Sequence, residues 1–492
     1  MLKIRLFILL VLLSLFIPLS GQISNINVDT TRLFRNTDTL HVVSSKPLLA
    51  SGIILFTNLG VWSFDRYITT SNYAHISINS ISKNIKTGFV WDNDMFATNL
   101  FAHPYHGGLY FNAARSNGIG FWKSIPYTAC GSLMWEFCME NEPAAINDFM
   151  ATTIGGTCLG EMTYRLSDLV VDDRSSGFER FGREFLLTLI SPSRGLNRII
   201  SGDCKRTRSV KGSTLTSMPL IFQLSIGHRI FKDYLNKPNN DVINAPTYDI
   251  RLNYGYPFDE DITHPYDAFL VKIEGNFFSS QPIISRVNAL AMLYSNYYPI
   301  NKNTGHFVFG VFQHFNFYES NTDINHISIH PYKISEAASV GPGILYMQKF
   351  KQKESRLLCS LHLSGILLGG SQTDHYKYEK RDYNMGSGFS TKLSAEIVLK
   401  NKWRFYINSE EYRIYSWVKS NPKNQLDINS NTQGDIGNAN LFVTRIGFNY
   451  FFQKHFILST ETSYNYRKSQ YKYYPEVKHA VVEHKTSIGY TF

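Results

Sequence analysis

The stretch Phe389-Ser-Thr-Lys-Leu-Ser-Ala-Glu-Ile-Val-Leu-Lys400 alternates between apolar and polar side chains. Its odd-numbered positions, from Phe389 to Leu399, are mostly apolar, whereas the even-numbered positions are mostly polar. A side-chain period of two indicates a β-strand whose two faces meet different surroundings. Residues 269–277 and 456–467 show the same alternation, which begins near residue 220. In a transmembrane barrel, the apolar face would meet lipid and the polar face would line the lumen.

The segments between these strands alternate in length. We expect tight turns at 351–354, 400–402 and 453–455, and long polar connections at 319–335, 370–385, 419–439 and 468–478. Outer-membrane barrels have short turns on the periplasmic side and long loops outside. The rule weakens near Ser279–Pro282, where the connection is short although a long loop is expected. The sequence therefore predicts a mainly β protein with a transmembrane antiparallel barrel of about 12 strands over residues 220–492.

The end of the chain reads Lys485-Thr-Ser-Ile-Gly-Tyr-Thr-Phe492, with apolar or aromatic side chains at alternate positions. A terminal Phe492 in this setting resembles the signature that the outer-membrane barrel assembly machinery reads. That machinery and outer-membrane lipid are the expected partners. The net charge of +10 is spread along the chain without a basic stripe. We therefore expect no nucleic-acid partner.

The beginning of the chain has the layout of a secretory signal peptide. Two cations precede an apolar run from Leu6 to Leu19, and small residues follow it. We expect residues 1–21 to be the signal peptide and residues 22–87 to be a lead segment. No later stretch of about 18 apolar residues is apparent, so we expect no transmembrane helix. Together with the barrel, export predicts the outer membrane of a Gram-negative cell.

Residues 88–205 differ in character, because polar side chains stand among small and aromatic ones. We expect one helix over Tyr127–Glu140, directly after Pro126, and a second over Ala144–Leu166. Three glycines in the second helix are costly there, and they indicate the close approach of another helix. We predict that this small α-helical domain lies on the periplasmic side.

The cysteines in this region leave one covalent question open. Export permits a disulfide between Cys158 and either Cys130 or Cys138, and the sequence does not choose between them.

Four motifs follow one another in the same region: HPYHGxxYFxxARSNG from His103, GSxxWE from Gly131, NDxxxTTxGGxxxGE from Asn147 and YRLSD from Tyr164. In this order they are similar to the domain-of-unknown-function 3943 family of exported outer-membrane barrel proteins. The resemblance covers roughly residues 88–205. It implies an outer-membrane setting and supplies no established reaction.

Seven polar side chains of this region are the candidates for a catalytic site. They are His103, His106, Arg115, Ser132, Glu136, Asp148 and Glu161. No cofactor and no metal is predicted, because two histidines three residues apart still need a third ligand that only the fold can place.

Three interpretations of these residues stay open. His103 and His106 with Glu136 could hold a metal. Ser132 with a histidine and a carboxylate could form a hydrolase site, although no G-x-S-x-G motif is present. The carboxylates could instead pair with arginines in a buried ion network, and the cost of unpaired buried charge favours this third interpretation.

Two main functional classes follow from these expectations. The first is a non-enzymatic barrel whose helical domain plugs or docks at the periplasmic mouth, with a structural, transport or assembly role. The second is an enzyme, a hydrolase or transferase, that acts on phospholipid or lipopolysaccharide through the His/Glu/Asp residues. A surface receptor is a third class, and it rests only on the long loops.

Overall fold

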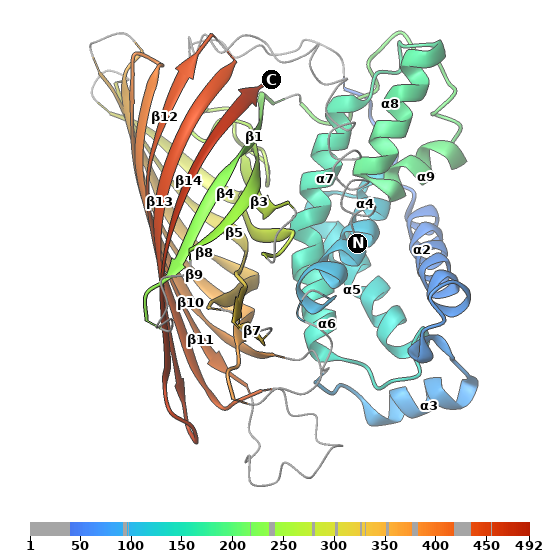
Figure 1. Ribbon diagram of the computed structural model, residues 1–492. Helices are drawn as coiled ribbons and strands as arrows, with labels where there is room; N and C mark the ends of the chain where they lie inside the picture. Colours follow the sequence, from blue (N-terminus) through green and yellow to red (C-terminus); the bar gives the residue numbers. More distant parts are fainter. Residues whose placement is uncertain are drawn as a thin grey trace. The chain divides into compact units, whose positions relative to one another are not determined.

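The computed structural model describes residues 40–91, 96, 98–216, 218–235, 242–277, 281–300, 304–324, 327–329, 331–350, 354–375, 382–417, 434–453 and 455–492. The expected signal peptide lies outside these residues. The chain divides into two compact units, with the boundary at residues 217 and 218. We call them the helical unit and the barrel, and each is described by itself (Figure 1).

The helical unit is built around α4, which contacts α2, α5, α7 and α9. Its α-helices are α2 (Pro47–Tyr67), α3 (Ile78–Thr87), α4 (His103–Ser116), α5 (Phe121–Cys138), α6 (Ile146–Met150), α7 (Gly156–Val170), α8 (Gly177–Ile190) and α9 (Pro192–Ile200). A short 3₁₀ segment, η2, covers Asn72–Ala74, and two π-helical turns, η3 and η4, cover Thr98–Ala102 and Ala151–Gly155.

Helix α2 corrects one expectation. It has 21 residues and is long and apolar enough to cross a membrane by length and composition. The sequence did not predict this helix as a membrane span, because Ser, Thr and Asn residues interrupt its apolar run. Ala50, Ile53 and Ile54 are buried, and the last two pack with Tyr110 of α4.

The other predicted helices have different bounds from those expected. Helix α5 begins at Phe121, so Pro126 lies inside it and not before it. The missing N–H of a proline removes one helix hydrogen bond, but the early start buries Phe121. The helix expected over Ala144–Leu166 is divided by the π-helical turn η4 into α6 and α7.

Helices α4 and α7 make the close contact that the glycines indicated. A Cβ atom on Gly107 would lie 1.8 Å from the carbonyl oxygen of Thr152, and one on Gly156 would lie 2.5 Å from Cα of Gly107. The disulfide question also receives an answer, since Cys130, Cys138 and Cys158 are all free thiols.

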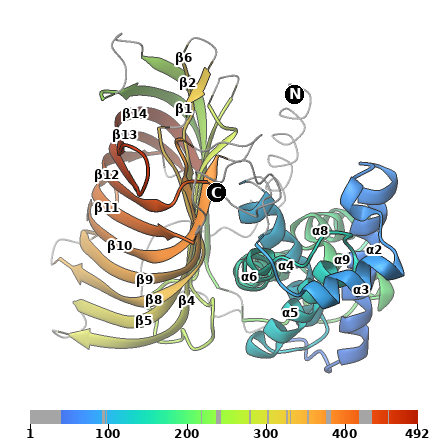
Figure 2. The same cartoon turned by 90° about the horizontal axis from the view of Figure 1, so that it is seen from below.

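The second unit is a closed antiparallel barrel, which confirms the predicted fold class. Around the wall the order is β1-β14-β13-β12-β11-β10-β9-β8-β5-β4-β3-β2, which is twelve strands. Figure 2 shows the run of neighbouring strands from β14 to β8 along this wall. The strands are β1 (Leu220–Asp233), β2 (Ile243–Tyr254), β3 (Phe269–Asn276), β4 (Ile284–Ile300), β5 (Gly305–Glu319), β8 (Lys333–Lys349), β9 (Arg356–Gln372), β10 (Tyr383–Leu399), β11 (Trp403–Ser416), β12 (Gly437–Phe452), β13 (Phe456–Tyr471) and β14 (Val477–Thr491). Strands β6 (Thr322–Ile324) and β7 (Ile327–Ile329) form a separate hairpin.

The side chains of β10 lie on two different faces, as the alternating pattern predicts. On β10, the apolar Phe389 and Leu393 are 46% and 52% exposed, whereas Ser390 between them is buried. Lys392 points to the inside, where its Nζ lies 2.8 Å from Glu336 of β8. On β10, apolar side chains therefore face outward and polar ones face the interior, as in a barrel that crosses a lipid bilayer.

The loop alternation holds with three exceptions, and the first is the short connection 277–283 that the sequence already indicated. Strands β13 and β14 extend further than expected, so their connection covers only residues 472–476 instead of 468–478. The connection 255–268 is long although it lies at the end of the short turns 400–402 and 453–455. That segment folds back into the barrel, where Phe258 packs against Met292, Val308 and Phe312 with other apolar residues.

Candidate functional site

The site begins where α4 begins. The π-helical turn η3 leads directly into His103, the first residue of α4, and Pro104 follows in the first turn of that helix. His103 therefore occupies the first turn of α4. The side chain of His103 is 12% exposed.

Two carboxylates meet His103 from two other helices. Glu136 lies near the end of α5, and its Oε2 accepts a hydrogen bond from the backbone N–H of Ala145 at 2.9 Å. Asp148 lies in α6, and its Oδ1 accepts one from Nδ2 of Asn147 at 2.7 Å. Both carboxylates are buried.

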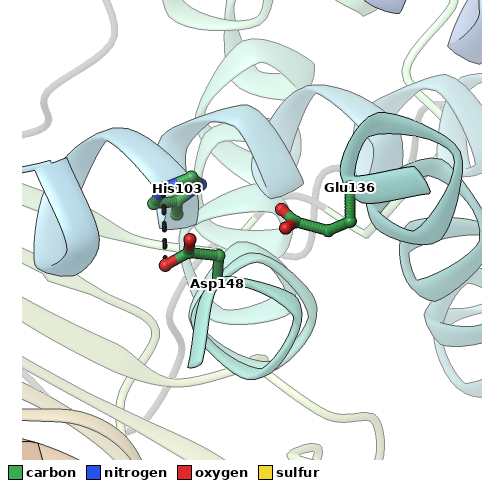
Figure 3. Close-up of side chains that lie close together, drawn as sticks. All are labelled: His103, Glu136 and Asp148. Carbon is green, nitrogen blue, oxygen red and sulfur yellow. Dashed lines mark ion pairs between the residues drawn. The ribbon is translucent and has the colours of Figure 1, made fainter. Parts of the chain in front are cut away.

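His103, Glu136 and Asp148 form one cluster, which we call the HED cluster (Figure 3). Nε2 of His103 lies 3.5 Å from Oδ1 of Asp148. One possible ligand atom from each of the three residues lies within 4.8 Å of the other two. Carboxylates and an imidazole at such distances can exchange a proton or hold a cation.

His106 is not part of this cluster. A metal bound by both His103 and His106 would need the two imidazoles at one site, and His106 contacts Tyr110 instead. Its Nε2 lies 2.8 Å from the hydroxyl of Tyr110, which donates a short hydrogen bond to Asn58. Burial, together with the charge of nearby His103, lowers the pKa of His106 to about 3. His106 is therefore a neutral imidazole at physiological pH.

Ser132 lies one turn before Glu136 on α5 and is buried. Its hydroxyl has no hydrogen-bond partner among the described residues, so it contacts neither histidine. A serine nucleophile needs a histidine within hydrogen-bond reach. The described geometry consequently gives no support to a serine-hydrolase site.

Arg115 and Glu161 form a second buried group, away from the HED cluster. Nε of Arg115 lies 2.7 Å from Oε2 of Glu161, and Nε of Arg165 lies 2.9 Å from Oε1 of the same carboxylate. Glu161 and Arg165 are four residues apart on α7, and Arg115 extends this i, i+4 pair to a triad. Because one carboxylate serves two guanidinium groups, this arrangement is that of a structural ion network.

A basic cavity in the helical unit was not predicted. It has a volume of about 360 Å³, and its lining includes Arg194, Arg198, Arg206 and Arg208. Carboxylates pair with these guanidinium groups. Burial alone would raise the pKa of Asp168, but Arg194 and backbone amides hold it below its usual value. The close spacing of arginines between residues 194 and 208 is the sequence feature that could have predicted this basic cavity.

The fold and these clusters define a class: a twelve-stranded barrel of the outer-membrane type that is preceded by a helical unit with a buried HED cluster. Residues 88–193 match the family model described as "Domain of unknown function (DUF3943)". The resemblance seen in the motifs is thereby confirmed, and the match ends at residue 193. No curated protein matches the chain.

Solved outer-membrane barrels are similar to this chain in part. "KdgM porin" is 9% identical, and the match covers 55% of this chain and 99% of that one with a TM-score of 0.24. "CymD monoaromatic hydrocarbon channel" is 11% identical over 57% and 90% of the two chains, with a TM-score of 0.21. The channel DcaP of Acinetobacter baumannii is 8% identical over 56% and 98%, with a TM-score of 0.23. The substrates of these proteins do not transfer to this chain.

Proposed function

We propose that the protein is an outer-membrane barrel with a closed lumen, which anchors the helical unit in the cell envelope. The observation that carries this proposal is that side chains from opposite walls meet inside the barrel. Arg445 of β12 donates to the hydroxyl of Tyr318 of β5 at 2.9 Å, although five strand-to-strand steps separate them around the wall. Arg286 of β4 likewise lies 3.9 Å from Glu461 of β13.

Further charges complete this lumen network. Lys272 bonds to Glu274 at 2.6 Å and lies 3.8 Å from Glu461, while Lys485 lies 3.2 Å from Glu274 and 3.3 Å from Asp249. The cavity that these side chains enclose has a volume of about 30 Å³. That space suits a water molecule or two and is too small for a solute.

Both ends of the lumen are filled as well. At the end of the short turns, segment 255–268 inserts Phe258 among apolar side chains, and Tyr256 donates to Sδ of Met347 at 2.9 Å. Towards the other end lies an apolar cluster of buried inward-facing side chains that includes Phe231, Ile414 and Val481. The barrel therefore does not need the helical unit as a plug. This packing agrees better with a barrel that anchors or docks the helical unit than with a barrel that the helical unit plugs.

The placement in the outer membrane and the side of the helical unit belong to the same proposal. The exposed apolar side chains on the barrel wall, such as Ile226, Ile446 and Ile488, support a lipid surround. Strand β1 begins at the end that carries the short turns, which in such barrels is the periplasmic end. The preceding helical unit would then lie in the periplasm. Outer-membrane lipid, and the barrel assembly machinery acting on the strand that ends at Phe492, remain the proposed partners.

Conductance in planar lipid bilayers tests the closed lumen. The purified wild-type protein should insert and give no steady ion current, whereas an open porin in the same bilayer provides the positive control. The double variant R286A/R445A removes side chains that cross the lumen and should increase the current. A steady wild-type conductance of porin size would overturn the proposal.

An envelope-lipid enzyme is the second candidate, because the HED cluster brings an imidazole and two carboxylates into contact. Such an enzyme would use His103, Glu136 or Asp148 and not Ser132. Mass spectrometry should compare outer-membrane lipids from the wild type, a deletion strain and a Glu136→Gln strain. A lipid change shared by both mutants would support this candidate, and identical lipids would remove it.

A further inference from the structure

We propose that the HED cluster binds a divalent transition-metal cation such as Zn²⁺ or Mn²⁺. Its three residues come from the start of α4, the end of α5 and the start of α6. Histidine nitrogen and carboxylate oxygens are ligands that these cations share in proteins. The proposal concerns the helical unit alone, so it holds or fails independently of the closed lumen.

The distances are close to those of a coordination sphere. Metal bonds of roughly 2.0–2.2 Å place neighbouring ligand atoms about 3.0–3.5 Å apart in tetrahedral or octahedral geometry. The distance of 3.5 Å between Nε2 of His103 and Oδ1 of Asp148 already matches one such edge. One carboxylate oxygen of Glu136 lies within 4.8 Å of a possible ligand atom of each of the other two residues. A side-chain movement of roughly 1 Å, well within a rotamer well, would complete the set.

The charge of the cluster also favours a cation. Two buried carboxylates that approach each other repel, and this repulsion raises the free energy of the state in which both are ionised. A divalent cation offsets the repulsion between the two carboxylates, and it leaves the imidazole neutral, which is the form that binds metal.

Hydrogen bonds around the cluster orient the ligands. The backbone N–H of Ala145 holds one oxygen of Glu136, and the side-chain amide of Asn147 holds one oxygen of Asp148. Partners of this kind fix the direction of a metal ligand before the metal arrives. The close packing of α4 on α7 through Gly107 and Gly156 holds the helix that carries His103.

The ligand set selects among cations. Ca²⁺ prefers six to eight oxygens, and Mg²⁺ keeps several waters, so an imidazole disfavours both. Among first-row divalent ions, a site of this type binds Zn²⁺ more tightly than Mn²⁺. We therefore expect the order of affinity to be Zn²⁺, then Mn²⁺, then Mg²⁺ and Ca²⁺.

The first test measures metal content in the full-length, tag-free protein in detergent. The protein is incubated with ZnCl₂, passed over a desalting column and analysed by inductively coupled plasma mass spectrometry. The wild type should retain about one zinc per chain, and His103→Gln or Asp148→Asn should retain at least tenfold less at limiting zinc. His75→Gln is the matched control, because it removes an exposed imidazole of the same unit.

X-ray absorption on the zinc-loaded wild type is the second test, and it needs no variant to fold. The expected spectrum contains one imidazole and oxygen ligands at about 2.0–2.2 Å. Three results would overturn the proposal: a wild type that retains no zinc, a spectrum without imidazole, or a His103→Gln protein that retains as much zinc as the wild type.

Discussion

The lumen of the barrel and the core of the helical unit both bury charged side chains, but they arrange them differently. In the lumen, cations and carboxylates alternate, so that Lys272 and Lys485 each contact several of Asp249, Glu274 and Glu461. In the helical unit, the charges form small separate groups. In the Arg115–Glu161–Arg165 triad, one carboxylate contacts two guanidinium groups, and the HED cluster brings two carboxylates together with one imidazole.

This difference separates a structural network from a candidate site. A network with several alternative partners tolerates the loss of one member, because the remaining charges can still pair. In a small group where two cations share one carboxylate, removal of that carboxylate breaks both contacts at once. Carboxylates that gather around an imidazole can additionally hold a cation. The following predictions test this contrast, from the largest expected effect to the smallest.

The largest effect should come from Glu161→Gln. This change leaves Arg115 and Arg165 buried without their common carboxylate, and breaking a buried ion pair costs about 3–5 kcal/mol. Urea unfolding followed by tryptophan fluorescence should show a weakened helical unit. The barrel should keep its heat-modifiable mobility on gels. A loss below about 1 kcal/mol would mean that the triad is not a structural network.

Acid should destabilise the helical unit through His106. Burial lowers its pKa to about 3, whereas an unfolded histidine has a pKa near 6.5. The stabilisation is therefore fully present above pH 6.5 and is lost as the pH falls towards 3, with a limit of about 5 kcal/mol. The fluorescence of Trp135, whose ring lies 4.9 Å from that of His106, reports the transition. The pH dependence should be much weaker in His106→Gln, and an unchanged profile would assign it to other groups.

Gly107→Ala should destabilise the contact between α4 and α7 by about 1–3 kcal/mol, because the new methyl group would meet the carbonyl of Thr152. It should also weaken zinc retention, since it moves the helix that carries His103. Gly182→Ala in α8 is the matched control, because a Cβ there meets nothing within 4 Å. That control should leave stability unchanged or raise it by up to about 1 kcal/mol. Equal effects of the two changes would argue against close helix packing.

The smallest effect should come from Glu461→Gln in the lumen, at about 1–2 kcal/mol. Lys272 and Lys485 keep Asp249 and Glu274 as partners, and the amide can still accept a hydrogen bond from Tyr406. Samples are incubated at increasing temperatures before electrophoresis. The temperature at which the folded band disappears from the gel measures the change in stability. A loss as large as that of Glu161→Gln would remove the contrast between the two regions.

Much of the barrel could be predicted from sequence, because its signal is local. A strand of a transmembrane barrel repeats the same two environments every two residues. The faces on which Phe389 and Lys392 lie can therefore be predicted without knowledge of any partner strand. Strand ends were harder to predict, since polar residues continue to pair beyond the membrane. The connection at 472–476 was therefore expected to be longer, and the folded-back segment 255–268 was not anticipated.

The seven candidate residues were visible in the sequence, but their grouping was not. Spacing suggested that His103 and His106 share a site, because three residues separate them on one helix. In the structure His106 turns to Tyr110, and Asp148 takes the place beside His103. The sequence equally offered Glu161 as a catalytic carboxylate, whereas the fold encloses it between two arginines.

The sequence by itself determined the class of protein: the alternation of strands, the number of strands and the family of residues 88–193 all follow from patterns within short windows. Only the tertiary structure decided that the lumen is crossed by charges and that His103, Glu136 and Asp148 meet. Their separations in sequence exceed any local period, and each of the three comes from a different helix: α4, α5 and α6. Side chains that come from three helices can be brought together only by packing, which no local pattern records.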